Sequence, residues 1–115
     1  MDTRIKIIDA AQAAVIANAG ATVVSGYFDP MIASHAERLA ALKPDGSQLL
    51  VLISTPPDPI LPALARAQLV AGLSVVDFVC DAPNGLAPHI GLEEEHRELL
   101  TQLIDHVHDR QRAAS

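Results

Sequence analysis

The sequence predicts one α/β domain, a three-layer α/β/α sandwich around a short, mostly parallel sheet of about three or four strands. Stretches with helical periodicity alternate with short apolar runs along the 115-residue chain. Half of the residues are hydrophobic, but only 3% are aromatic. A core of Ala, Leu, Val and Ile suits helices packed on a parallel sheet better than it suits an aromatic-rich β-sandwich. A domain of this length, residues 1–115, can bury a core without disulfides or metal.

The leading segment, residues 1–19, is expected to form one helix from Thr3 to about Asn18, with Thr3 or Asp2 as the N-cap. Gly20 is a suitable residue to follow its end, because glycine readily adopts the left-handed conformation found there. The apolar face of this helix is predicted at Ile5, Ile8, Ala11 and Val15.

The first strand is expected at Ala21–Ser25, just before Gly26. Asp29 followed by Pro30 fits an N-cap and the first position of a second helix, since a carboxylate accepts helix N–H groups and proline has none to lose. That helix is expected to end at the turn 43–46. Its apolar positions are Ile32, Ala36, Leu39 and Ala40.

A second strand is expected at Gln48–Ser54, because a run that is apolar on both faces is typical of a central parallel strand covered by helices. Asp58-Pro59 repeats the cap-then-proline start of a helix, which Pro62 would delay by a few residues. The helix should continue to Ala71, and a third strand should follow at Val75–Cys80.

The last third of the chain begins with a turn at 83–85. The segment Leu86–Ile90 reads as irregular or as a short edge strand. A long amphipathic helix is then expected over Leu92–Arg112, with a solvated acidic start in which Glu93 can pair with Arg97 one turn later. Its apolar side comprises Leu92, His96, Leu99, Leu100, Leu103 and Val107.

The charge and composition of the chain limit the classes of partner that it is expected to bind. A net charge of −6 argues against a nucleic-acid partner, because no basic patch neutralises phosphates. No apolar stretch is long enough to predict a membrane segment. Cys80 is the only cysteine and is expected in a buried strand, which fits the reducing cytoplasm. The first strand would leave an open edge of the sheet, and proteins rarely leave such an edge bare. We expect either Leu86–Ile90 to add there as a short strand or a second copy of the chain to cover it, and a homodimer is therefore one expected state.

The segment between the first strand and the second helix carries the most specific motif. Gly26, Phe28, Asp29 and His35 stand at the matching places of the pattern G-x-F-D-x-x-[HT]-x-G-H. This segment resembles the signature of the cytidylyltransferase-like nucleotidyltransferase family, of the glycerol-phosphate cytidylyltransferase and sugar-phosphate adenylyltransferase type. The likeness extends over residues 21–81, through Arg66 and a Val-Asp pair before the third strand.

The resemblance implies a Rossmann-like (HUP-type) fold with strand order 3-2-1-4-5, and it implies nucleotidyl transfer as the activity. Such enzymes join a nucleoside triphosphate, here CTP or ATP with Mg²⁺, to a small phosphorylated substrate and release pyrophosphate. It implies that His35 is the catalytic, phosphate-contacting residue. The implied nucleotide-binding residues are Gly26, where the backbone approaches the nucleotide, Tyr27, Phe28, Asp29, Ser34 and Arg66.

Two positions depart from the pattern: Ile32 replaces the first His or Thr, and Ser34 replaces the Gly. The late I-S-[ST]-T motif with its basic clamp is missing, and Glu93–Glu95 would repel a triphosphate. Three hypotheses therefore stand: an active nucleotidyltransferase that acts on a small phosphorylated substrate, a non-catalytic nucleotide- or phosphate-binding domain, and a scaffold that uses its surface for self-association or for a partner protein.

Other polar residues have plainer explanations. Asp77, at the entrance of the third strand, is expected to be structural. The histidines near the C-terminal helix are disfavoured as a metal site, because His106 and His108 point to different helix faces and His96 is distant in sequence.

Overall fold

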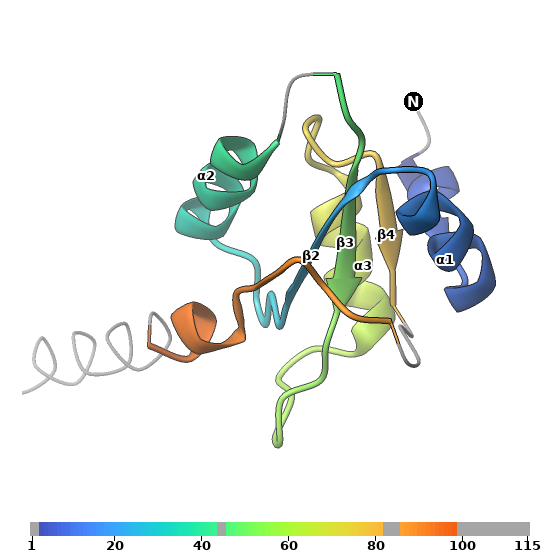
Figure 1. Ribbon diagram of the computed structural model, residues 1–115. Coiled ribbons are helices and arrows are strands. Elements are labelled where there is room, and N and C mark those ends of the chain that lie inside the picture. Colours follow the sequence, from blue (N-terminus) through green and yellow to red (C-terminus); the bar gives the residue numbers. More distant parts are fainter. Residues whose placement is uncertain (1–2, 44–45, 82–85, 99–115) are drawn as a thin grey trace, which may run out of the picture.

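The computed structural model describes residues 3–43, 46–81 and 86–98, which form a parallel sheet with helices packed on it (Figure 1). The sheet has five strands in the order β1-β4-β3-β2-β5, and every pairing is parallel. The prediction of three or four strands is therefore wrong by at least one. The strands are β1 (Ile7–Ile8), β2 (Thr22–Gly26), β3 (Leu49–Ile53), β4 (Phe78–Cys80) and β5 (Ile90–Gly91).

The N-terminal segment is not one helix. A 3₁₀ turn (Thr3–Lys6) and β1 precede α1, which spans only Ala10–Asn18. Asp9 starts α1, because its carboxylate accepts the Gln12 N–H at 2.8 Å while the Gln12 side chain accepts the Asp9 N–H at 3.2 Å. The predicted apolar face is also wrong, since Ile5 is 76% exposed and Val15 is 69% exposed.

The two central strands lie where the sequence predicts them. β2 pairs with β3 in register from Thr22–Leu49 to Gly26–Ile53. On the other side of β2, Ile90 and Gly91 of β5 pair with Val24 and Ser25, so β5 covers the edge that the sequence left open. The first of the two expected ways of covering that edge is therefore confirmed.

Two hydrophobic clusters pack against the sheet. One joins α2 (Ala33–Leu42) and α3 (Ala63–Ala71) to it, and the other joins α1 to it. Successive strand residues point to opposite faces, so the neighbours Val23 and Val24 belong to different clusters. The first cluster includes Val24, Leu39, Leu49, Val51, Ile53, Val70 and Val79, and the second includes Ala13, Val23, Leu50, Leu52 and Cys80.

The remaining boundaries agree with the sequence pattern to within a few residues. α3 begins directly after Pro62, the delayed start, and β4 occupies the second half of the expected third strand. A helix begins at Glu93 and is described to Glu98. The turn at 83–85 and the rest of the expected C-terminal helix lie outside the described residues. Within the described ranges, no helix is long and apolar enough to cross a membrane.

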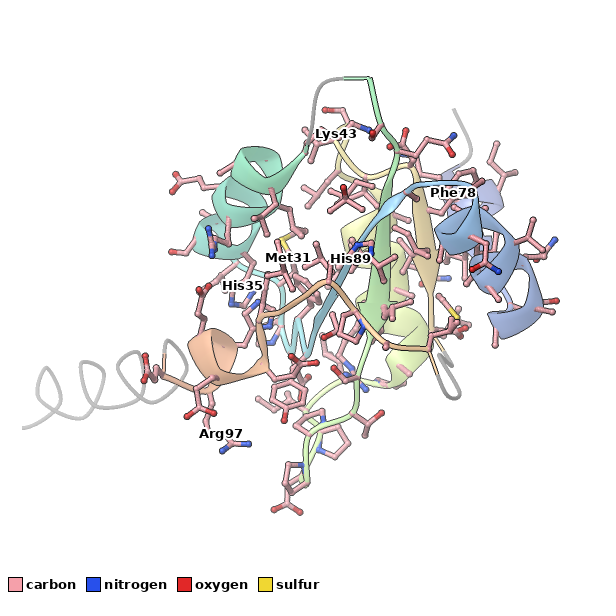
Figure 2. The ribbon with its side chains drawn as sticks, in the orientation of Figure 1. Met31, His35, Lys43, Phe78, His89 and Arg97 are labelled. Carbon is pink, nitrogen blue, oxygen red and sulfur yellow. The ribbon has the colours of Figure 1, made fainter. Side chains whose placement is uncertain are left out.

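Asp77 fastens the amino end of the sheet, as the sequence predicts. Its carboxylate forms an ion pair with Lys43 and accepts the Leu49 N–H at 2.7 Å. Burial alone would raise the pKa of Asp77, but the hydrogen bonds from Lys43 and Leu49, together with the charges of Lys43 and Lys6, outweigh burial and lower it. Lys43 and Arg97 lie at opposite ends of the sheet (Figure 2).

Candidate functional site

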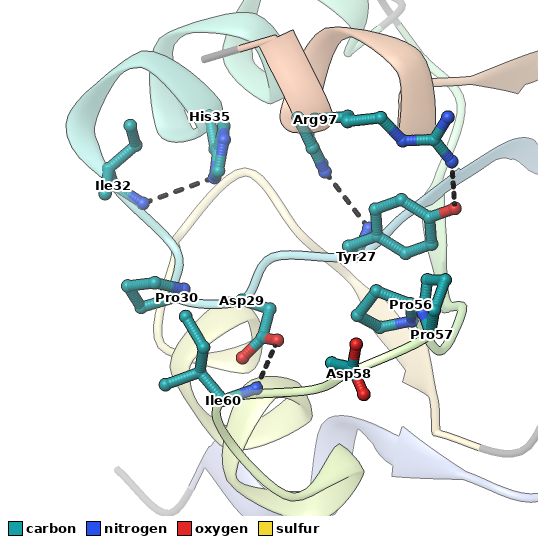
Figure 3. A pocket seen from close by; sticks show the side chains of 11 residues that line it. Tyr27, Asp29, Pro30, Ile32, His35, Pro56, Pro57, Asp58, Ile60 and Arg97 are labelled. Carbon is teal, nitrogen blue, oxygen red and sulfur yellow. Dashed lines mark hydrogen bonds between the residues drawn. The ribbon is translucent and has the colours of Figure 1, made fainter. Parts of the chain in front are cut away.

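A pocket of about 270 Å³ opens at the carboxyl ends of β2 and β3, the edge where parallel sheets bind their ligands. Four segments build it: the β2–α2 loop, the first turn of α2, the β3–α3 loop and the helix at 93–98 (Figure 3). The lining residues are Tyr27, Asp29, Pro30, Ile32, His35, Pro56, Pro57, Asp58, Ile60, His96 and Arg97.

Asp29 holds the β3–α3 loop and does not cap α2. Its two carboxylate oxygens accept the N–H groups of Ile60 and Leu61 at 2.6 and 2.7 Å (Figure 3). The predicted capping role is therefore wrong, because α2 begins at Ala33 with Ile32 as its N-cap residue. Asp29 is 8% exposed, so these two hydrogen bonds satisfy a nearly buried carboxylate.

The start of α2 explains the state of His35. The side chain of Ile32 has no acceptor, so no side chain caps the first N–H groups of α2. His35, at the third helical position, accepts the Ile32 N–H through Nδ1 at 3.3 Å. A neutral imidazole that accepts at Nδ1 carries its proton on Nε2. His35 is 4% exposed and thus presents a buried Nε2–H donor beside a helix N-terminus (Figure 2).

A second imidazole comes from the far end of the chain. His96, on the helix at 93–98, accepts the Tyr27 N–H through Nδ1 at 3.0 Å, which again places the proton on Nε2. Its ring centroid lies 4.0 Å from that of His35. We expected neither this pairing nor a place for His96 in the pocket. The signal in the sequence was a histidine within the apolar side of an amphipathic helix.

Both imidazoles are neutral at pH 7. Burial lowers the pKa of His35, against an opposing attraction from Glu95. Burial and the neighbouring His35 lower the pKa of His96 to about 3, against an opposing attraction from Glu93. Among the residues that the structure describes, neither Nε2 has a hydrogen-bond partner, although both atoms are buried. Because Nδ1 accepts in each ring, Nε2 is a donor and is not free to bind a metal ion.

Gly26 and Phe28 shape the floor beneath the two rings. A Cβ on Gly26 would lie 2.4 Å from Cε1 of His96 and 2.7 Å from the Phe28 ring, so His96 occupies the space that the missing side chain leaves. Phe28 is fully buried, with its backbone at φ 48°, and its ring contacts His96 and His35 edge-on at 4.5 and 5.7 Å between centroids.

Arg66 is buried behind the pocket and connects the β2–α2 and β3–α3 loops. It is 1% exposed and donates to the carbonyl oxygens of Leu61 (3.1 Å), Tyr27 (3.1 Å) and Ser54 (2.7 Å). Arg66 is not among the residues that line the pocket, and its implied role in nucleotide binding stays a prediction. The guanidinium instead fixes the distance between the β2–α2 and β3–α3 loops.

Glu93 attaches the closing helix to the strand ends. Its Oε1 accepts the hydroxyl of Ser25 at 2.5 Å and that of Ser54 at 2.8 Å. Burial alone would raise the pKa of Glu93, but these two hydrogen bonds and smaller favourable interactions together outweigh burial and lower it. The expectation of a solvated Glu93 is therefore wrong. Arg97 forms an exposed ion pair with Glu94 at 4.0 Å.

Further contacts hold the same helix to its neighbours. Glu95 forms an exposed ion pair with Arg38 of α2 at 3.3 Å. Arg97 donates to the Tyr27 hydroxyl at 3.4 Å. The helix at 93–98 thus touches both strand ends, the β2–α2 loop and α2, and it forms one wall of the pocket.

The sequence-predicted site residues fall into four groups. His35, Tyr27 and Asp29 line the pocket, and Gly26 and Phe28 support its floor. Arg66 is buried below it. Ser34 is exposed on α2 and does not line the pocket, since it precedes His35 on the helix and points elsewhere. Among the described residues, no group of three or more His, Cys, Asp or Glu side chains could hold a metal ion.

No protein-family model, curated protein or solved structure matches this chain. The chemistry of the pocket is therefore inferred from its own geometry.

Proposed function

We propose that the chain is a nucleotidyltransferase-like domain with a three-layer, Rossmann-like (HUP-type) fold that binds a nucleotide through its phosphate in this pocket. The strand order supports the proposal. If β2, β3, β4 and β5 are numbered 1 to 4, the sheet reads 3-2-1-4, and β1 adds to the outer edge. The pocket lies at the end of β2, whose two neighbours are reached in opposite directions, the usual place for a ligand in such sheets.

One observation carries the proposal: the unpartnered Nε2–H donors of His35 and His96, with ring centroids 4.0 Å apart. They lie beside the start of α2, which no side chain caps. Phosphate oxygens suit both features, because they accept from N–H donors and interact favourably with the positive end of a helix. A buried donor without a partner costs about 1–3 kcal/mol, so an acceptor at this point stabilises the folded chain.

A second candidate function is the complete transfer reaction with CTP or ATP and Mg²⁺. His96 favours this reaction, because its ring supplies a second imidazole in place of the first histidine of the family pattern, which Ile32 replaces in this chain. The chain would then position a substrate phosphate for attack on the α-phosphate and stabilise the charge that develops. Of the described lining residues, however, only Arg97 carries a positive charge, so we place binding before transfer.

Calorimetric titration of the full chain with CTP and ATP, with and without Mg²⁺, tests the proposal. We expect saturable binding by the wild type, and loss of binding in His96→Asn, which keeps an acceptor near the Nδ1 position but lacks the Nε2–H donor. His89→Asn is the matched control, since His89 is exposed and lies outside the pocket. Nucleotide-dependent pyrophosphate release would identify the transfer reaction. Failure of every nucleotide to bind would overturn the proposal.

A further inference from the structure

We infer that the nucleotide taken by this site is a nucleoside monophosphate, with its single phosphate at the paired imidazoles of His35 and His96 and its base against the apolar walls of the pocket. This inference rests on the proposed nucleotide-binding function. It differs from the resemblance, which implies a nucleoside triphosphate.

The charge of the pocket limits the number of phosphates. Its described lining contains two carboxylates, Asp29 and Asp58, and one cation, Arg97, which is already close to Glu94. Arg66 is buried beneath the loops with three carbonyl partners. Each phosphate beyond the first would add negative charge that, among the described lining residues, only Arg97 could meet, and like charges at close range disfavour binding.

Acidic residues also surround the two imidazoles. Glu95 acts on His35 and Glu93 acts on His96, as their opposing influence on the two pKa values shows. A single phosphate can be met by the two neutral N–H donors and the uncapped start of α2. A triphosphate chain has no comparable set of donors among the lining residues.

The size and walls of the pocket fit a nucleoside. Its volume of about 270 Å³ lies just below the range of about 300–1,000 Å³ typical of pockets for drug-sized ligands. Flat or apolar side chains form most of the wall, and an aromatic base can stack on such surfaces. These side chains are Tyr27, Pro30, Ile32, Pro56, Pro57 and Ile60.

The two donors lie just below the surface of the pocket. Both Nε2 atoms are buried. One of them, that of His96, is carried by the helix at 93–98, which Glu93 holds in place through its hydrogen bonds to Ser25 and Ser54. The closing helix thus belongs to the binding site as well as to the fold.

Calorimetry on the full chain without Mg²⁺ tests the inference. The titrants are AMP, CMP, ATP and CTP, with inorganic phosphate and glycerol 3-phosphate as ligands that carry a phosphate without a base. We expect AMP or CMP to bind at least about tenfold more tightly than its triphosphate and than either ligand without a base. His96→Asn should weaken AMP and CMP, whereas His96→Gln, whose amide nitrogen can lie near the Nε2 position, should retain more of the affinity.

Asp58→Asn gives a second test that leaves the fold intact, because Asp58 is exposed. Removing this carboxylate should improve triphosphate binding more than monophosphate binding and so narrow the difference between them. Triphosphates that bind as tightly as monophosphates to the wild type would overturn the inference and leave the proposed function standing. Equal binding of inorganic phosphate would overturn the part played by the base. Absence of binding by every nucleotide would overturn both proposals.

Discussion

The imidazole rings of His35 and His96 lie with their centroids 4.0 Å apart and their planes inclined by 36°. Each ring uses Nδ1 to accept a backbone N–H of the segment after β2, from Ile32 to His35 and from Tyr27 to His96. These contacts fix the tautomer of both rings, and they leave two Nε2–H donors without partners. The same two side chains therefore hold the loop through Nδ1 and present their own unpaired Nε2–H donors to the pocket.

Replacement of His96 should separate its structural role from its binding role. His96→Ala removes the acceptor of the Tyr27 N–H and empties the space beside Gly26, so we expect the free energy of unfolding to fall by about 2–4 kcal/mol. His96→Asn keeps an acceptor and should lose only about 1 kcal/mol. Urea unfolding of the three proteins measures the difference. Equal stability of the two variants would contradict the hydrogen bond to Nδ1.

The stability of the fold should fall as the pH is lowered below about 6.5. The pKa values of His35 and His96 are lower in the folded chain than their ordinary value of 6.5, and that of His96 is about 3. As the pH falls, the unfolded chain therefore takes up protons before the folded chain does, and stability that is complete above pH 6.5 is lost towards pH 3. Between these two pKa values His96 contributes a slope of about 1.4 kcal/mol per pH unit, and His35 adds to it with the same sign.

Unfolding measurements between pH 6.5 and 5 isolate the contribution of the histidines. The carboxylates Asp77 and Glu93 stay ionised in this range, because their pKa values in the folded chain lie below the ordinary 3.8 and 4.5. Protonation of these two carboxylates also destabilises the fold, but it begins at lower pH. His96→Asn should flatten the slope by about 1.4 kcal/mol per pH unit. An unchanged slope in this variant would mean that His96 is protonated in the folded chain.

Gly26→Ala should be destabilising because of His96 and not because of backbone conformation. The added Cβ would lie 2.4 Å from Cε1 of His96, and displacing that ring should cost about 1–3 kcal/mol. In the double variant with His96→Ala, the ring is gone and the cost of the added methyl group should shrink. A double-mutant cycle by urea unfolding measures this coupling. Strict additivity would contradict the contact.

Arg66 should resist a conservative replacement. Arg66→Lys keeps the positive charge, but one ammonium cannot reach the carbonyl groups of Leu61, Tyr27 and Ser54 together. We expect it to lose about 2–4 kcal/mol, nearly as much as Arg66→Met. Thermal or urea unfolding of both variants tests this. Wild-type stability in the lysine variant would show that charge alone is required.

The central part of the fold could be predicted because each signal there is local. The apolar run Leu49–Ile53 and the β-branched run before Gly26 both became parallel strands. The sequence pattern predicts a helix over Ile7 and Ile8, but Asp9 caps α1 after them, and they pair with Val79 and Cys80 of β4. That pairing is a long-range contact, which periodicity does not report.

The site was only half predicted for the same reason. His35 lies in a recognisable local motif, whereas His96 reaches the pocket only because β5 lies beside β2. Asp29 was assigned to the nearest helix, although the N–H groups that it binds belong to Ile60 and Leu61 of another loop. Residue spacing predicts partners within one helix or turn, and it does not predict partners that the sheet brings together.

The most direct test of the account is ¹⁵N NMR of the histidine side chains, which reports the tautomer and protonation of each ring. At pH 7 we expect His35 and His96 to be neutral with the proton on Nε2, and we expect both Nε2–H signals to shift when AMP or CMP is added. A proton on Nδ1 in either ring, or signals that no nucleotide moves, would contradict the account.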